Sequence, residues 1–165
     1  MTKAHPETTI GHVHLHVADL ERSLGFYRDI LGFEVTARYS DSAVFLSAGG
    51  YHHHIGLNTW QGKGATPAPE GHSGLYHFAI LFPTRKELAT VLKRLIDAGY
   101  PLTGSSDHGV SEALYLDDPD GIGVELCADR PRSTWKVGND GVVEMKTVAL
   151  DIENLLSELE AEAFR

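Results

Sequence analysis

The sequence contains one arrangement of elements twice, and this repeat constrains the fold more than any other feature. A strand pattern, an amphipathic helix pattern and further strand patterns fill residues 10–59, and the same order returns over residues 76–127. His12 stands in the first strand of the first unit, and His77 follows it by 65 residues, at the matching place in the second unit. The sequence therefore predicts two similar units, each built as a strand, a helix and about three strands.

In the first unit, residues 10–17 alternate apolar and polar side chains, the pattern of a half-buried strand. Three histidines share one face of this strand, namely His12, His14 and His16. Asp19 is expected to cap a helix that runs to about Leu31, and Gly32 is expected to end it. Strands are predicted over residues 33–39, 42–48 and 52–59.

In the second unit, residues 76–82 form a strand pattern that contains His77. Thr84 and Glu87 have the spacing of a capping box, which predicts a helix to about Ala98. Further strands are predicted around residue 102, over 113–117 and over 123–127, with a turn at 118–121 between the last two.

The units are expected to form a single domain over residues 1–165, because a chain of 165 residues can bury one core. Its parts are a first module at about 8–60, a loop at 61–74, a second module at about 75–129 and a C-terminal extension at 130–165. The extension has an irregular part with Trp135, a short strand over 142–147 and a helix capped by Asp151. That helix could cover the domain or pair with another subunit.

The composition limits the kinds of partner. The net charge of −9, from 14 basic and 23 acidic residues, argues against nucleic acid or an anionic membrane surface as a partner. No stretch reaches the ~20 apolar residues of a membrane helix, and residues 1–9 lack the apolar run of a signal peptide, so a cytoplasmic location is expected. The single cysteine, Cys127, excludes an internal disulfide and reads as a buried small side chain or a cavity residue.

Three residues suggest a metal site: His12, His77 and Glu125. A single histidine more often has an ordinary packing or surface role, but these two occupy matching places in the two units. Glu125 lies between Val124 and Leu126, where a carboxylate is costly to bury without a cation. Two imidazoles and one carboxylate can hold a divalent metal and leave further positions open for substrate.

Several segments resemble the vicinal oxygen chelate superfamily. Residues 12–20, 23–27 and 31–33 are similar to its opening strand and helix, and residues 118–126 are similar to its closing pair of strands. The resemblance covers about residues 10–130. It implies an α+β fold with two βαβββ modules that form a mixed sheet curled around a metal cavity, here followed by a C-terminal helix.

Within this superfamily the chain is most similar to type I extradiol ring-cleavage dioxygenases of the catechol 2,3-dioxygenase kind. The metal ligands of that family fall on His12, His77 and Glu125. Tyr115 matches the tyrosine that bonds to the catecholate, although a purely structural role in filling the cavity is an equal alternative. His108 stands in a segment that resembles one carrying another pocket histidine.

A histidine-rich segment, residues 51–58, resembles the strand that supplies an acid–base histidine beside the oxygen site. As a strand, it would present His52 and His54 on one face and His53 on the other. His54 is the favoured inward group.

The resemblance also implies the cofactor and the partners. Fe(II) is the first choice of metal, and Mn(II) or another divalent metal is the alternative. The expected substrates are a small catechol-type aromatic compound and O2, and a homodimer is possible. Two features depart from the pattern: many relatives have two such domains where this chain has one, and Ile122 stands where Asn is common.

Three other functions belong to the same superfamily. A glyoxalase-type isomerase needs a fourth ligand near Leu57, where Gly56 has no ligating side chain, so this function would require His54 to take that place. A fosfomycin-type thiol transferase is expected to have more Lys and Arg around its site. A metal-free drug-binding protein would lack the His, His and Glu set that this chain retains.

Overall fold

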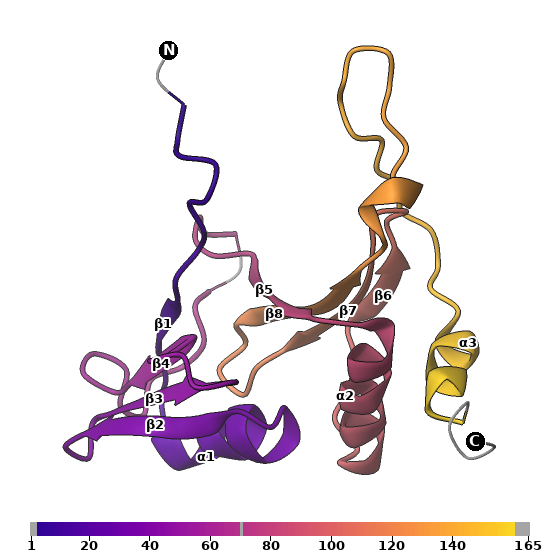
Figure 1. Ribbon diagram of the computed structural model, residues 1–165. Coiled ribbons are helices and arrows are strands. Elements are labelled where there is room, and N and C mark those ends of the chain that lie inside the picture. The colour runs from indigo at the N-terminus through magenta and orange to yellow at the C-terminus, as the bar shows by residue number, and fades with distance from the viewer. Residues whose placement is uncertain (1–2, 70, 161–165) are drawn as a thin grey trace. The chain divides into compact units, whose positions relative to one another are not determined.

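The computed structural model describes residues 3–69 and 71–160, which divide into two compact units between residues 66 and 67 (Figure 1). Each unit contains a four-stranded mixed sheet and a helix that follows the first strand. The fold is therefore α+β, as the sequence predicts. Within the described residues, no helix has the length and apolar character needed to span a bilayer.

The first unit contains one sheet in the order β1-β4-β3-β2, with β1 parallel to β4 and the other pairs antiparallel. Its elements in chain order are β1 (Val13–His16), α1 (Leu20–Leu24), η1 (Gly25–Ile30), β2 (Glu34–Tyr39), β3 (Ala43–Ser47) and β4 (Ile55–Asn58).

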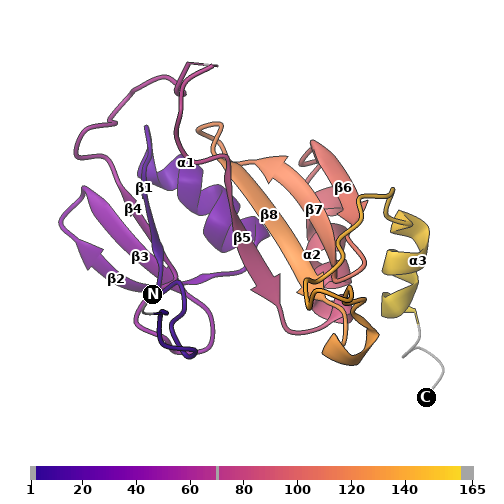
Figure 2. The same cartoon turned by 90° about the horizontal axis from the view of Figure 1, so that it is seen from above.

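The second unit repeats this topology with the order β5-β8-β7-β6, in which β5 is parallel to β8 (Figure 2). Its elements are β5 (His77–Phe82), α2 (Arg85–Asp97), β6 (Gly104–Asp107), β7 (Ser111–Asp117), β8 (Gly123–Asp129), η2 (Arg132–Thr134), α3 (Ile152–Leu156) and η3 (Ser157–Leu159). The predicted repeat is confirmed, because both units place the first strand beside the fourth.

The start of the first unit follows its sequence pattern closely. Leu15 and Val17 are buried at 6% and 1% exposure, while the three alternating histidines are exposed. The Asp19 side chain accepts a hydrogen bond from the Arg22 amide at 2.9 Å and so caps α1 as predicted. The helix then widens into the π-helical η1 instead of continuing regularly to residue 31, and it buries the adjacent Phe26 and Tyr27.

The helix of the second unit begins where predicted, but its cap differs from a capping box. The Thr84 hydroxyl donates to the Glu87 carboxylate and makes no hydrogen bond to the backbone of the first turn. The helix ends before Gly99, whose φ of +63° is a backbone conformation that glycine adopts without strain.

The predicted strand over the consecutive histidines is wrong, because β4 begins only at Ile55. The Nδ1 atom of His54 accepts a hydrogen bond from the Ala48 amide at 3.3 Å and lies 3.0 Å from the Ser47 hydroxyl. These contacts fold residues 48–54 back on the end of β3, so this segment turns instead of extending β4.

The C-terminal extension also differs in detail from its prediction. In place of a strand over 142–147 there are two isolated bridges, Val137 with Val143 and Asp107 with Val148. Asp151 caps α3 as predicted, since its side chain accepts from the Asn154 amide at 2.9 Å. The helix α3 lies beside α2 (Figure 1).

Other strand boundaries moved by a few residues. The strand predicted around residue 102 is β6, which starts at Gly104, and β7 starts at Ser111 rather than at 113. The shift brings Asp107 to the end of β6 and leaves His108 in the turn that follows.

Candidate functional site

Two of the predicted ligands lie in contact within the second unit. The Nε2 atom of His77 lies 2.9 Å from the Oε2 atom of Glu125. His77 opens β5, and Glu125 lies opposite Ala79 in the parallel pairing of β5 with β8. Because side chains two residues apart share a face, His77 and Glu125 point to the same side of the sheet.

The close approach of β5 and β8 depends on Gly123, the register partner of His77. A Cβ atom at Gly123 would lie 2.2 Å from the carbonyl oxygen of Tyr76, a distance that no packed carbon can occupy. The absence of a side chain at this position lets the two strands lie at the spacing that brings His77 to Glu125.

Tyr115 and His108 extend this contact into a chain of four side chains. Tyr115 is the antiparallel partner of Glu125, and its hydroxyl lies 3.3 Å from Oε1 of Glu125. The Nε2 atom of His108 lies 2.7 Å from the same hydroxyl. The structure thus brings four predicted site residues together: His77, Glu125, Tyr115 and His108.

Burial and the neighbouring carboxylate of Glu125 raise the pKa values of Tyr115 and Cys127. Burial, and then the charge of Glu125, raise the pKa of Tyr115 to about 12. Burial, and then the same charge, raise the pKa of Cys127 to about 12. Both groups therefore stay protonated at neutral pH, which makes Tyr115 a hydrogen-bond donor. Cys127 is only 7% exposed and fits its prediction as a buried small side chain.

The donor set fits a divalent cation. The Glu125 side chain is 14% exposed, and a carboxylate so placed is stabilised by a nearby positive charge. His77 and Glu125 would hold such an ion through an imidazole nitrogen and a carboxylate oxygen, and their donor atoms Nε2 and Oε2 lie 2.9 Å apart. Within residues 3–69 and 71–160, no group of three or more His, Cys, Asp or Glu side chains is arranged to hold a metal. The pair thus offers two ligands, and His12 belongs to the other unit.

In the first unit, His12 is exposed immediately before β1 and stands against His53. The two ring centres are 4.4 Å apart, and the His53 ring also meets Phe45 edge-on at 5.0 Å. The Nδ1 atoms of His52 and His53 are 2.7 Å apart. Burial, and then the charge of His12 and its neighbours, lower the pKa of His53.

His54 has a different environment from His53. Its Nδ1 atom is engaged by Ser47 and Ala48, and its ring packs against Phe33 and Tyr51 at centroid distances of 6.4 and 4.9 Å. The strand-face argument that favoured His54 does not hold for a turn. The Gly49-Gly50 pair, whose residues both have positive φ, begins this turn in the sequence.

His14 lies between two aromatic rings that the sequence did not single out. Its ring centre is 5.7 Å from that of Phe45 and 5.6 Å from that of Trp60. Burial, and then the neighbouring histidines, lower its pKa. Gly56 lies opposite His14, and a Cβ atom there would come within 2.9 Å of the His14 ring.

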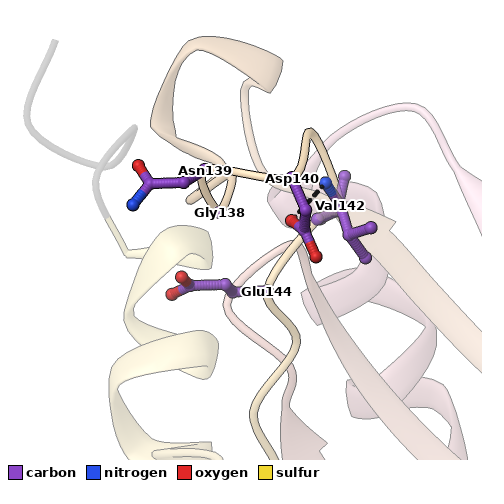
Figure 3. A pocket seen from close by; sticks show the side chains of 6 residues that line it. Gly138, Asn139, Asp140, Val142 and Glu144 are labelled. Carbon is purple, nitrogen blue, oxygen red and sulfur yellow. Dashed lines mark hydrogen bonds between the residues drawn. The ribbon is translucent and has the colours of Figure 1, made fainter.

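Two of the hollows that the described residues form lie in the second unit. One of about 290 Å³ adjoins the site and is lined by Tyr76, His77, Thr103, Gly104, Tyr115, Leu116, Asp117, Gly123 and Val124. The other, of about 430 Å³, lies in the turn around residues 138–144, where the Asp140 side chain accepts from the Val142 amide at 3.0 Å (Figure 3). Only the first contains candidate site residues, so it is the better candidate for a substrate pocket.

Comparison with known sequences identifies a family and several relatives of this chain. Residues 9–126 match the profile of the glyoxalase/bleomycin resistance protein/dioxygenase superfamily. The chain is 48% identical to a catechol-2,3-dioxygenase of Bacillus subtilis, over 96% of this chain and 54% of the relative. It is 34% identical to biphenyl-2,3-diol 1,2-dioxygenase 3 of Rhodococcus globerulus, over 73% of this chain and 63% of the relative. The chain therefore spans between about half and two thirds of the length of these relatives.

Solved structures agree with this placement. A glyoxalase/bleomycin resistance protein/dioxygenase domain from Frankia sp. EAN1pec matches with a TM-score of 0.62 and 28% identity, over 74% of this chain and 98% of that domain. A glyoxalase/dioxygenase from Nostoc punctiforme shares the fold, with a TM-score of 0.65 at 17% identity over 79% of this chain and 99% of that one. With the profile match covering most of its length, the chain belongs to the glyoxalase/bleomycin resistance protein/dioxygenase superfamily.

Proposed function

We propose that this chain is an extradiol dioxygenase that opens a catechol-type aromatic ring. Such a reaction breaks the ring C–C bond between one hydroxyl-bearing carbon and the adjacent carbon that bears no hydroxyl. Both atoms of O2 enter the product. The observation that carries the proposal is the contact of His77 with Glu125, with the Tyr115 hydroxyl on the other carboxylate oxygen. The 48% identity to a catechol-2,3-dioxygenase supports the same reaction.

In this proposal His12, His77 and Glu125 hold a divalent metal, with Fe(II) as the first choice and Mn(II) as the second. When bound, the ion supplies open positions where a catechol and O2 meet, and it relays electrons between them. The protein's own contribution is to fix the ligands, to hold the substrate and to supply protons.

Tyr115 is suited to hold a substrate oxygen. Because its pKa is raised to about 12, its hydroxyl remains protonated across the working pH range of most enzymes, and with this proton directed to His108 its oxygen can accept a hydrogen bond from a substrate hydroxyl. The ring of His77 lies 5.7 Å from the ring of Tyr115, so a catechol oxygen near His77 would lie close to this hydroxyl. We propose that His108, 2.7 Å from the hydroxyl, keeps Tyr115 oriented toward the substrate.

We propose His53, rather than His54, as the acid–base histidine. The His53 ring lies 4.4 Å from that of His12, whereas Nδ1 of His54 makes contacts with Ser47 and Ala48. A histidine that transfers protons must lie within reach of the reacting atoms, and His53 is the neighbour of a proposed ligand.

The isomerase alternative receives less support from the local packing. A glyoxalase-type fourth ligand would have to come from the region of Gly56, where any side chain would meet the His14 ring. The dioxygenase therefore remains the function that the geometry supports best.

The test is to load the purified protein with Fe(II) without oxygen and then to add catechol and air. We expect consumption of one O2 per catechol and the yellow product of extradiol cleavage. His12→Ala and His77→Ala should each abolish both iron retention and turnover, whereas His5→Ala, at an exposed N-terminal histidine, should change neither.

Three results would count against the proposal. A protein that retains no iron but binds aromatic drugs would be a binding protein. A protein that turns over a thiol adduct without consuming O2 would be a transferase or isomerase. Full activity in the His12→Ala or His77→Ala variant would refute the ligand assignment.

A further inference from the structure

The C-terminal extension runs along the outer edge of β6, beside His108. Asp107 and Val148 exchange two backbone hydrogen bonds, from the Asp107 amide at 2.9 Å and from the Val148 amide at 3.2 Å. The Lys146 amide donates to the His108 carbonyl at 3.1 Å, and the Lys146 ammonium lies 3.2 Å from the Asp107 carboxylate. Residues 146–148 therefore add a short antiparallel segment to this edge of the sheet.

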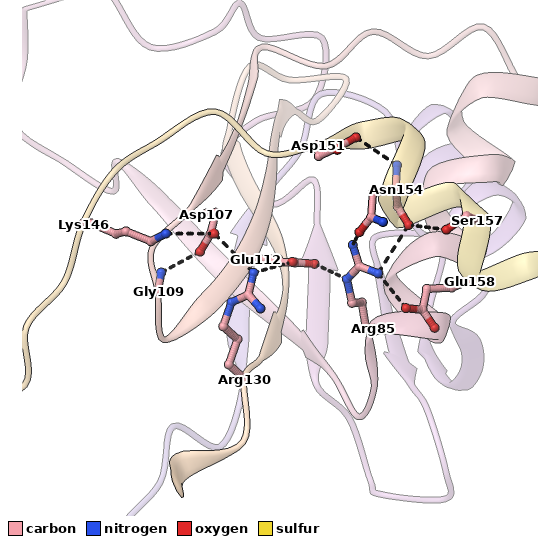
Figure 4. A network of polar contacts seen from close by, with 10 residues as sticks. All are labelled: Arg85, Asp107, Gly109, Glu112, Arg130, Lys146, Asp151, Asn154, Ser157 and Glu158. Carbon is pink, nitrogen blue, oxygen red and sulfur yellow. Dashed lines mark hydrogen bonds and ion pairs between the residues drawn. The ribbon is translucent and has the colours of Figure 1, made fainter. Parts of the chain in front are cut away.

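An ionic network secures the extension where it starts (Figure 4). Arg130, which directly follows β8, lies 3.2 Å from the Asp107 carboxylate and 2.7 Å from that of Glu112. Glu112 is only 4% exposed, so this contact is shielded from solvent.

The same network secures the far end of the extension. Arg85 of α2 lies 2.6 Å from Glu112 and 2.6 Å from Glu158, and it donates to the Asn154 side chain at 2.8 Å. With α3 tied to α2 and Arg130 tied to β6 and β7, residues 146–148 are held between two anchored points.

This placement determines which nitrogen of His108 carries the proton. The Nδ1 atom of His108 lies 2.9 Å from the carbonyl oxygen of Lys146, and a carbonyl oxygen can only accept. Nδ1 must therefore be the donor, which leaves Nε2 of a neutral ring with a lone pair. That lone pair faces the Tyr115 hydroxyl at 2.7 Å, so the hydroxyl proton points to His108.

A second group near Nδ1 does not change this assignment. The Thr147 hydroxyl lies 3.4 Å from Nδ1, at the far limit of a hydrogen bond. If Thr147 donated to a bare Nδ1, the lone pairs of Nδ1 and the Lys146 carbonyl would face each other at 2.9 Å, which is repulsive.

We propose that the C-terminal extension is a positioning element of the site, in which the backbone carbonyl of Lys146 holds His108 in its Nδ1–H tautomer and thereby aims Nε2 at the Tyr115 hydroxyl. The Tyr115 proton then has two competing acceptors, His108 at 2.7 Å and Glu125 at 3.3 Å, and the extension favours the first. The effect of this positioning on catalysis rests on the proposed function, whereas the tautomer of His108 does not depend on it.

The first test is the 15N spectrum of the histidine rings in the full-length protein at about pH 8.5, where an ordinary imidazole is neutral. We expect His108, assigned with a His108→Gln variant, to show a protonated Nδ1 and an unprotonated Nε2. Thr147→Val should leave this pattern unchanged. An Nε2–H ring in the wild-type protein, or a switch of tautomer in Thr147→Val, would overturn the proposal.

The second test breaks the pairing of the extension. Val148→Pro removes the amide that donates to Asp107, and we expect both His108 nitrogens to show the averaged shifts of mixed tautomers. Met145→Pro is the matched control, because Met145 is exposed and its amide takes no part in the pairing with residues 107–108. Val148→Pro should also lower kcat for catechol by ~10- to 100-fold, with iron content unchanged.

The two tests separate this proposal from the proposed function. If the tautomer is as expected but no catechol is cleaved, the dioxygenase assignment fails and the positioning of His108 stands. If catechol is cleaved but Val148→Pro alters neither the ring shifts nor kcat, the positioning role fails and the dioxygenase assignment stands. Should Val148→Pro not fold, the wild-type and Thr147→Val spectra still decide the question.

Discussion

Glu125 Oε2 lies 2.9 Å from His77 Nε2, although 47 residues of sequence lie between these two residues. The parallel pairing of β5 with β8 creates this contact, which supplies two donor atoms for one cation. Glu125→Gln keeps the shape and removes the charge, so it should weaken Fe(II) binding by at least ~100-fold. Iron content after dialysis measures the effect, with Glu153→Gln, at an exposed glutamate, as the control. Equal iron in both variants would contradict the role of Glu125.

Tyr115→Phe removes the hydroxyl that lies between His108 and Glu125. We expect iron to be retained, because no ligand is lost, and kcat for catechol to fall by ~10- to 100-fold. The pKa of Tyr115 is raised to about 12, so deprotonation begins only near that pH and the wild-type rate should show no tyrosine ionisation between pH 6 and about pH 9. Steady-state kinetics across this range check both points, and an unchanged kcat would remove Tyr115 from the mechanism.

The two neighbouring histidines should respond differently to the same substitution. His53→Gln should retain iron and slow turnover by ~10²-fold or more, since it removes the proposed acid–base group beside His12. His54→Gln should instead cost about 1–2 kcal/mol of unfolding free energy, because it disturbs the bonds to Ser47 and Ala48. Kinetics and urea unfolding of both variants provide the comparison. Slower turnover in His54→Gln alone would restore His54 to the acid–base role.

Cys127 should resist alkylation in the folded protein. With its pKa raised to about 12 by burial and by Glu125, the thiolate fraction at pH 8 is on the order of 10⁻⁴, and the thiol is 7% exposed. We expect iodoacetamide to modify it at least ~100-fold more slowly in the native protein than in urea. Mass spectrometry of timed samples gives the rates. Comparable rates in the two conditions would show that this side of β8 is open.

Glu112 should contribute more to stability than Glu158, although both contact Arg85. The Glu112 side chain is 6% exposed and that of Glu158 is 38% exposed. We expect Glu112→Ala to cost about 2–3 kcal/mol, because it leaves Arg85 and Arg130 without their shared partner. Glu158→Ala should cost less than about 1 kcal/mol. Urea unfolding measures both, and equal losses would contradict the role of burial.

The repeated architecture could be predicted because it depends on local patterns. The alternation around Leu15 and Val17, the Asp19 cap and the Asp151 cap each act within a few residues, and each recurs in the structure. The strand expected over residues 52–59 begins only at Ile55, because the segment before it turns back on the end of β3, to which the His54 ring bonds.

The candidate site was predictable in its residue types and less so in its geometry. His77, Glu125, Tyr115 and His108 were identified from motifs, and the structure brings them together. No sequence pattern could reveal the role of Lys146, because its contribution to His108 is a backbone carbonyl. The joining of His12 to His77 and Glu125 stays a prediction, which the iron-binding variants test.

Gly123 carries a consequence for anyone who wishes to transplant or redesign this centre. The separation of His77 from Glu125 depends on a neighbouring position that must remain bare, since even one methyl group would collide with the Tyr76 carbonyl. Saturation libraries aimed only at reactive groups would overlook it. A scaffold chosen to host the His77–Glu125 pair would also need a glycine at the position that pairs with His77 on the neighbouring strand.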